Sequence, residues 1–114
     1  MKDHGRVFGA LSAILRGHAQ GMSIRTDDPG HLYVELAPTD PKARPRFFGA
    51  VQAKKAYVSF HLMPVYEDPR LLDGISPALR KRMQGKSCFN FTAPDAALFE
   101  ELDALTGRCA AAAR

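Results

Sequence analysis

Two neighbouring segments with alternating side chains limit the folds open to this chain of 114 residues. Residues 46–53 read RFFGAVQA and residues 56–63 read AYVSFHLM, and each shows the two-residue period that is typical of a strand. Lys54 and Lys55 separate them and mark a turn, so the two segments are predicted to form a hairpin. The pairs expected on its apolar, core-facing side are Val51 with Val58, Gly49 with Phe60, and Phe47 with Leu62.

The opposite side of this hairpin is mixed in character, and we expect a binding site there. Its predicted members are Phe48, Ala50, Gln52, Tyr57, Ser59 and His61. A further strand is expected in SCFNFT (residues 87–92), where Phe89 and Phe91 point into the core and Cys88 and Asn90 point the other way. The candidate ligand-binding residues are therefore Tyr57, Ser59, His61, Lys86, Cys88 and Asn90.

The other elements follow from periodicity and from start and stop signals. Apolar residues at helical spacing predict a first helix, with its stripe at Val7, Phe8, Leu11, Ile14 and Leu15. Residues 22–28 and 31–37 alternate and flank the turn sequence DDPG, which indicates a second hairpin. Ser76 and Pro77 open a short helix that Gly85 is expected to stop, and Pro94 and Asp95 open a last helix. The stripe predicted for that last helix is Ala97, Leu98, Leu102 and Leu105.

Together these elements predict one α+β domain spanning residues 1–114, in the order α-β-β-β-β-α-β-α. We expect an antiparallel sheet of about five strands with helices packed mainly on one face.

The hydrophobic content of 46% and charged content of 25% are ordinary for a globular protein. No apolar run approaches the ~20 residues of a membrane helix, so no membrane partner is expected. Arg16 and His18 end the apolar N-terminal run, which predicts a cytoplasmic protein with Cys88 and Cys109 reduced.

Charge and motif spacing disfavour several function classes. The net charge is +4, but no run of five basic residues occurs and Trp is absent, which argues against a nucleic-acid partner. The four histidines lack metal-ligand spacing, so neither a metal site nor a cofactor is expected.

The GKS at residues 85–87 resembles the end of a phosphate-binding loop. However, Arg80 stands where that motif needs its first glycine, and here a helix precedes a strand.

The segments FFGAVQAKKAYVSFHLMPVY and LLDGISPALRKRMQGKSCFNF resemble the YdhG-like family of small bacterial domains of unknown function, and especially a subgroup whose core ends in GKSCFNF. The resemblance spans roughly residues 5–107 and is most specific from Phe47 to Phe91. It implies a compact cytoplasmic α+β domain. Some members are described as frataxin-like intracellular iron chaperones, which implies an acidic ridge. The first helix here, HGRVFGALSAILRGHAQ, has no carboxylate, so such a ridge would have to come from elsewhere, such as the last helix.

Three hypotheses about function follow. The first is a non-enzymatic binding module whose mixed face takes a small anionic ligand or a protein partner, or serves as a homodimer interface. The second is iron delivery, implied by the resemblance and not by these residues. The third is a thiol enzyme that uses Cys88 together with His61 and Asn90. No catalytic residue is assigned under the first hypothesis, which we prefer.

Overall fold

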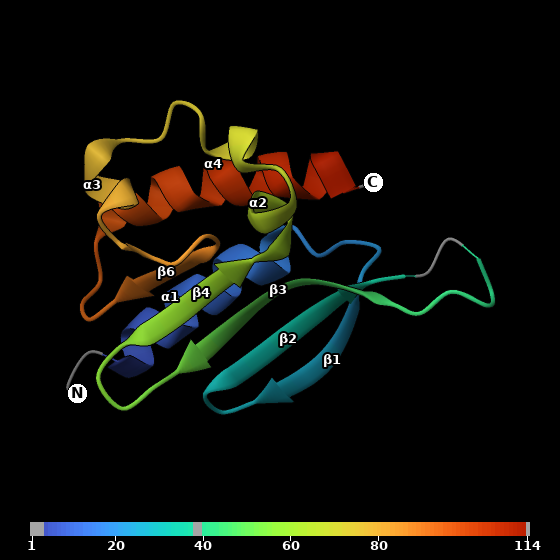
Figure 1. Cartoon of the computed structure of the whole chain (residues 1–114). Coiled ribbons are helices and arrows are strands. Elements are labelled where there is room, and N and C mark those ends of the chain that lie inside the picture. The colour runs from blue at the N-terminus through green and yellow to red at the C-terminus, as the bar shows by residue number, and fades with distance from the viewer. Residues whose placement is uncertain (1–3, 38–39, 114) are drawn as a thin grey trace.

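An antiparallel sheet of six strands, in the order β1-β2-β3-β4-β6-β5, organises the chain (Figure 1). The structure, a computed structural model, describes residues 4–37 and 40–113. The elements are α1 (His4–Gly17), β1 (Ser23–Asp28), β2 (His31–Leu36), β3 (Arg46–Ala53), β4 (Val58–Leu62), α2 (Met63–Glu67), a 3-10 turn η1 (Pro69–Leu72), α3 (Pro77–Arg80), β5 (Met83–Gln84), β6 (Cys88–Phe91) and α4 (Ala96–Ala113). The predicted α+β class and element order are confirmed, and the two-residue β5 makes the sheet one strand larger than expected.

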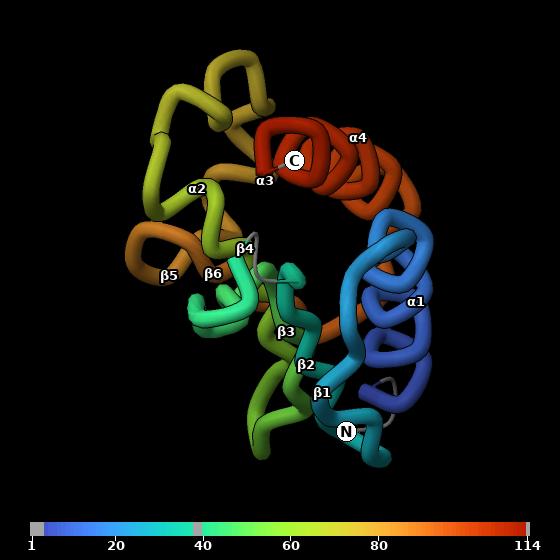
Figure 2. Tube along the Cα trace, turned by 90° about the vertical axis from the view of Figure 1, so that its right-hand side faces the viewer, coloured from blue at the N-terminus to red at the C-terminus, as the bar shows by residue number. Residues whose placement is uncertain are grey.

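The two long helices lie on the same side of the sheet. Helix α1 packs on β3 and β4, and α4 packs on α1 (Figure 2). Ser76 caps α3 as predicted, because its hydroxyl oxygen accepts a hydrogen bond from the Leu79 amide at 3.1 Å. The same hydroxyl donates to Glu101 Oε1 at 2.7 Å, which ties α3 to α4. Within the described ranges, no helix has both the length and the apolar character that spanning a bilayer demands.

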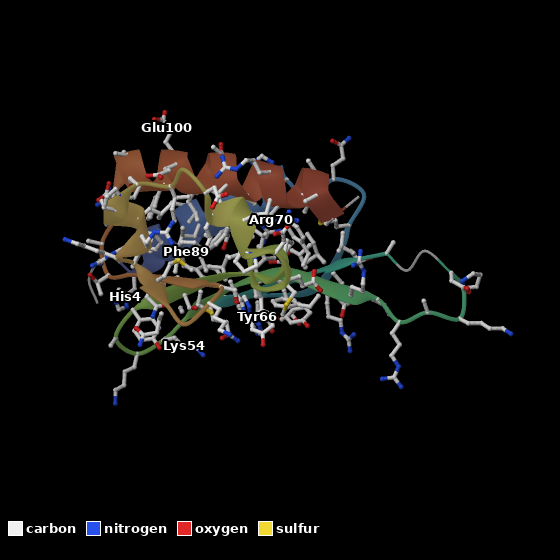
Figure 3. All side chains as sticks on the ribbon, turned by 45° about the horizontal axis from the view of Figure 1, so that its top comes forward. His4, Lys54, Tyr66, Arg70, Phe89 and Glu100 are labelled. Atoms are coloured by element: carbon white, nitrogen blue, oxygen red, sulfur yellow. The ribbon has the colours of Figure 1, made fainter. Side chains whose placement is uncertain are left out.

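The core fills the space between the sheet and these helices. Phe89 of β6 lies inside it, whereas Glu100 of α4 and Lys54 of the β3–β4 turn lie on opposite sides of the molecule (Figure 3). The largest fully buried side chains are Phe48, Phe60, Phe89, Phe91, Leu11, Leu15, Leu32, Leu62, Leu79, Leu102, Leu105 and Val7. Their burial is the main favourable term for folding, at roughly 25 cal/mol per Å² of apolar surface.

A β-bulge in β3 exchanges the expected roles of Phe47 and Phe48. The pairing of β2 with β3 runs from Val34 opposite Gly49 directly to Glu35 opposite Phe47, which leaves Phe48 as the extra residue. A bulge of this kind sends two consecutive residues to the same side. Phe48 is consequently fully buried under the helices. Phe47 is half-buried on the opposite face, so the prediction that placed Phe47 in the core and Phe48 outside it is wrong.

The β3–β4 hairpin pairs two residues away from the predicted register. Val51 lies opposite Phe60 rather than Val58, and Gly49 lies opposite Leu62. The reason is the position of the turn: the Lys54 amide donates to the Tyr57 carbonyl at 2.7 Å, so Lys55 and Ala56 form the tip. A shift of two residues preserves the faces, because side chains alternate with a period of two. The residues on each side of this hairpin are therefore as predicted, except at the bulge.

Two smaller expectations are wrong for local reasons. Gly85, with φ of +80°, sits in the turn between β5 and β6 instead of ending a helix. In α4 the buried stripe is Phe99, Leu102, Leu105, Thr106, Cys109 and Ala110, so Ala97 is exposed. Ile24 is 44% exposed because β1 is an edge strand, and a second bulge follows it in the pairing with β2.

Gly49 is the glycine at which an added Cβ would make the shortest contact with the rest of the structure. An added Cβ would lie 2.9 Å from the His61 carbonyl oxygen and 3.1 Å from Leu15 Cδ1. We therefore expect Gly49→Ala to reduce the free energy of unfolding by about 2 kcal/mol, the usual size of an overpacking penalty. Urea denaturation monitored by circular dichroism measures the change.

The matched control is Gly9→Ala, because an added Cβ at Gly9 in α1 meets nothing within 4 Å. Alanine favours a helix interior over glycine by up to about 1 kcal/mol, so this variant should gain stability. Equal effects of the two substitutions would contradict the close approach of α1 and β4 to Gly49.

Candidate functional site

The face of the sheet that points away from α1 contains a hollow over β2, β3, β4 and β6. Its volume is about 440 Å³, within the range of small-molecule sites. Ala50 of β3 lies at its floor, between bulkier neighbours on the adjacent strands. The small side chain at this position leaves the space open.

The register of the sheet places most of the predicted site residues together. His61 lies opposite Cys88, and Ser59 lies opposite Asn90, on the neighbouring strands β4 and β6. These four residues line the hollow, and Tyr57 joins them from the β3–β4 turn. Lys86 does not line this hollow. It lies on the turn after β5, where its Nζ is 5.9 Å from the centre of the Tyr66 ring.

A row of rings crosses three strands on this face. Tyr33 of β2 stacks on Phe47 of β3, with 4.7 Å between ring centres. His31 meets the edge of Tyr33 at 6.2 Å, and His61 meets Phe47 at 4.9 Å. Such contacts add roughly 0.5–1.5 kcal/mol per pair beyond the area that they bury. The row therefore gives the hollow a fixed aromatic wall. Tyr33 and His31 were not among the predicted site residues, although their alternation with Leu32 and Val34 places them on the outward face of β2.

Hydrogen bonds hold both histidines of this wall. The Gln52 side-chain nitrogen donates to His31 Nε2 at 3.2 Å, since an amide nitrogen cannot accept. His61 Nε2 shares a 2.7 Å hydrogen bond with Ser87 Oγ, and Ser87 is only 5% exposed. Burial lowers the pKa of His61 below that of a free imidazole. His61 is thus held neutral and in a fixed orientation. The contact of Ser87 with His61 could not be predicted from the sequence, because the two-residue period of β6 places Ser87 on the core side with Phe89.

Asn90 leaves hydrogen-bonding capacity unused. Its Oδ1 is enclosed and has no partner among the described residues. An enclosed acceptor without a partner costs about 1–3 kcal/mol, which a ligand donor could recover after rotation of the amide. The backbone of Asn90 is fixed, because its N–H donates to the Arg82 carbonyl at 2.8 Å.

The formal charge among the residues that line the hollow is positive. Lys54, at its rim, is the only formally charged residue among those described that line it. Glu35 lies on the same face beside Phe47, but Arg25 neutralises it through an ion pair at 3.3 Å. A negatively charged ligand is therefore attracted to the rim and meets no uncompensated carboxylate inside.

Several carboxylates already have side-chain partners. Besides Glu35 with Arg25, these are Asp27 with Arg16, Asp103 with His18, Asp68 with Arg70, and Glu101 with Ser76. In residues 4–37 and 40–113, no three His, Cys, Asp or Glu side chains lie together in a way that could hold a metal ion.

The two cysteines differ in environment, and both are free. Cys88 is half-buried in the lining of the hollow. Cys109 of α4 has no exposed surface, and burial raises the pKa of its thiol to about 12. Only Cys88 is thus placed to react with a molecule in solution.

Comparison of the chain with protein-family models, with curated proteins and with solved structures finds no match. The lining of the hollow combines an aromatic wall, neutral hydrogen-bonding groups and a single cation at the rim.

The neutral state of His61 predicts a pH dependence of stability. The pKa of this group lies near 6.5 in the unfolded chain and lower in the folded protein. From about pH 6.5 downward the unfolded chain binds more protons, so the free energy of unfolding falls as pH falls, by at most ~1.4 kcal/mol per pH unit. Above that range the contribution stays constant. Urea unfolding between about pH 7.5 and pH 5 measures the slope.

His61→Gln is the control, because it removes the titrating group and keeps a side chain that can bond to Ser87. Its slope should be shallower than that of the parent protein over the same interval. Parallel slopes would show that protonation of His61 is not coupled to unfolding, whatever the absolute stability of the variant.

The cysteine environments predict selective alkylation. In the folded protein iodoacetamide should modify Cys88 and spare Cys109, whose thiol is protonated and enclosed. In denaturant both should react, as measured by the mass of the intact protein. Folded Cys88→Ser should take up no label. Labelling of that variant at a rate similar to that of the parent would contradict the burial of Cys109.

Proposed function

We propose that this protein is a non-enzymatic binding module whose open sheet face holds a small anionic ligand with a flat, unsaturated part. The observation that carries the proposal is the hollow over Ala50, walled by the stacked rings of Tyr33 and Phe47 and bordered by Lys54. Flat groups bind well against aromatic walls, because they fit closely and displace poorly bound water.

The contacts of His61 favour binding over thiol catalysis. A cysteine nucleophile needs a neighbouring base or cation to generate thiolate. His61 stands opposite Cys88, but its Nε2 is engaged by Ser87 at 2.7 Å. This arrangement fixes the imidazole as a wall of the hollow. The iron-delivery alternative draws less support from the contacts, since the carboxylates Asp103 and Glu101 of α4 bond to His18 and Ser76.

A larger side chain at Ala50 tests the proposal directly, because it would fill the hollow. Ala50 is 8% exposed and points away from the core, so Ala50→Leu should occupy the ligand space without disturbing the buried face. We expect 2-naphthoate to shift the NMR signals of the residues around Ala50 in the parent protein, and we expect the variant to lose this binding at least tenfold. The matched control is Ala97→Leu on the exposed face of α4, which should bind as the parent does.

A second comparison tests the preference for anions. Lys54→Gln should lower the affinity for 2-naphthoate roughly two- to fivefold, the range of an exposed charge interaction. The affinity for the neutral 2-naphthamide should stay unchanged. Lys55→Gln is the control, because this neighbouring residue does not line the hollow. An absence of shifts with either compound, or shifts that Ala50→Leu leaves intact, would contradict the proposed function.

A further inference from the structure

A second hollow of different character adjoins the one over Ala50. The second hollow has a volume of about 220 Å³ and lies beside β5 and the end of β6. Tyr57, Gln84 and Asn90 line both hollows, so these three side chains form the partition between them. A ligand that occupies the first hollow can therefore extend past Asn90 into the second.

The second hollow is cationic. Lys81 and Arg82 line it, and no carboxylate among the described residues does. Neither side chain takes part in an ion pair within the described part of the chain. Arginine binds phosphate through two parallel hydrogen bonds, and lysine adds a compact positive charge.

Backbone hydrogen bonds fix the points at which these two side chains attach to the chain. The Arg82 amide donates to the Leu79 carbonyl at 2.9 Å, and the Arg82 carbonyl accepts from the Asn90 amide at 2.8 Å. The Lys81 amide donates to the Pro77 carbonyl at 3.0 Å. Fixed attachment points reduce the ordering penalty of binding.

From this juxtaposition we infer that the ligand is a phosphate monoester of a planar ring compound, of the nucleoside monophosphate class. The ring lies in the hollow over Ala50, and the phosphate lies between Lys81 and Arg82. Asn90, at the partition, offers its unused amide oxygen to a donor on the ring or its linker. This inference rests on the proposed function, because it names the anionic group of the ligand that the first hollow holds.

The experiment compares AMP with adenosine by isothermal titration calorimetry. We expect AMP to bind the parent protein at least tenfold more tightly than adenosine does. In the double variant Lys81→Gln, Arg82→Gln this preference should disappear, while adenosine should bind as before. The matched control is Arg80→Gln, Lys86→Gln, which removes two nearby cations that line a different hollow. It should keep the full preference for AMP.

Several outcomes would overturn the inference. They are equal binding of AMP and adenosine, loss of the preference in the control variant, and retention of it in the double variant. A single-stranded hexanucleotide that binds more than tenfold more tightly than AMP would assign the face to a nucleic-acid strand instead. The 2-naphthoate titration separates the two proposals: if naphthoate binds over Ala50 and AMP does not, only the phosphate inference fails. If neither binds, both fail.

Discussion

The bulge at Phe48 and Gly49 is the constraint on which both faces of the sheet depend. It turns two consecutive residues toward the helices, where Phe48 fills the core and Gly49 leaves room for Leu15 of α1. The same irregularity turns Phe47 outward, where it stacks on Tyr33 and meets His61. One extra residue in β3 therefore decides which of the two rings fills the core and which one forms the wall of the hollow. A regular strand would exchange the two rings, with Phe47 in the core and Phe48 on the outer face one position further along β3.

The binding proposed for the outer face would rest on side chains of modest individual effect. Ala50 provides space, the rings provide flat surface, and hydrogen bonds from Gln52 and Ser87 hold the two histidines. None of these residues is chemically unusual by itself. Their combination on adjacent strands produces a preorganised surface that is lined by Lys54 and adjoins the hollow lined by Lys81 and Arg82. Preorganisation of this kind lowers the entropy penalty of binding without adding new contacts.

Periodicity was sufficient to predict the fold class and most members of the hollow. The alternation of β4 and β6 placed Ser59, His61, Cys88 and Asn90 on one face, and this holds even though the β3–β4 register is shifted, because a shift of two preserves the faces. The bulge was beyond this reasoning, because Phe47 and Phe48 are the same residue type and either one can fill the core.

Other errors arose where one residue type serves two structures or where a contact is long-range. Glycine with positive φ both ends helices and forms tight turns, so Gly85 gave no sign that β5 precedes it. Ser87 reaches His61 across 26 positions in sequence, and Lys86 leaves the hollow because the turn carries it toward Tyr66. Such placements depend on how distant segments pack, and local spacing does not record that.

The two edges of the sheet limit how other molecules can approach it. On one side β1 carries a bulge and charged residues such as Arg25 and Asp27, and on the other β5 is only two residues long. Both are features that hinder the addition of a foreign strand, since they offer few regularly spaced backbone donors and acceptors. Under the proposed function, recognition falls to the side chains of the open face. The specificity of such a site would change by substitution there, without any change in the backbone hydrogen bonding that builds the sheet.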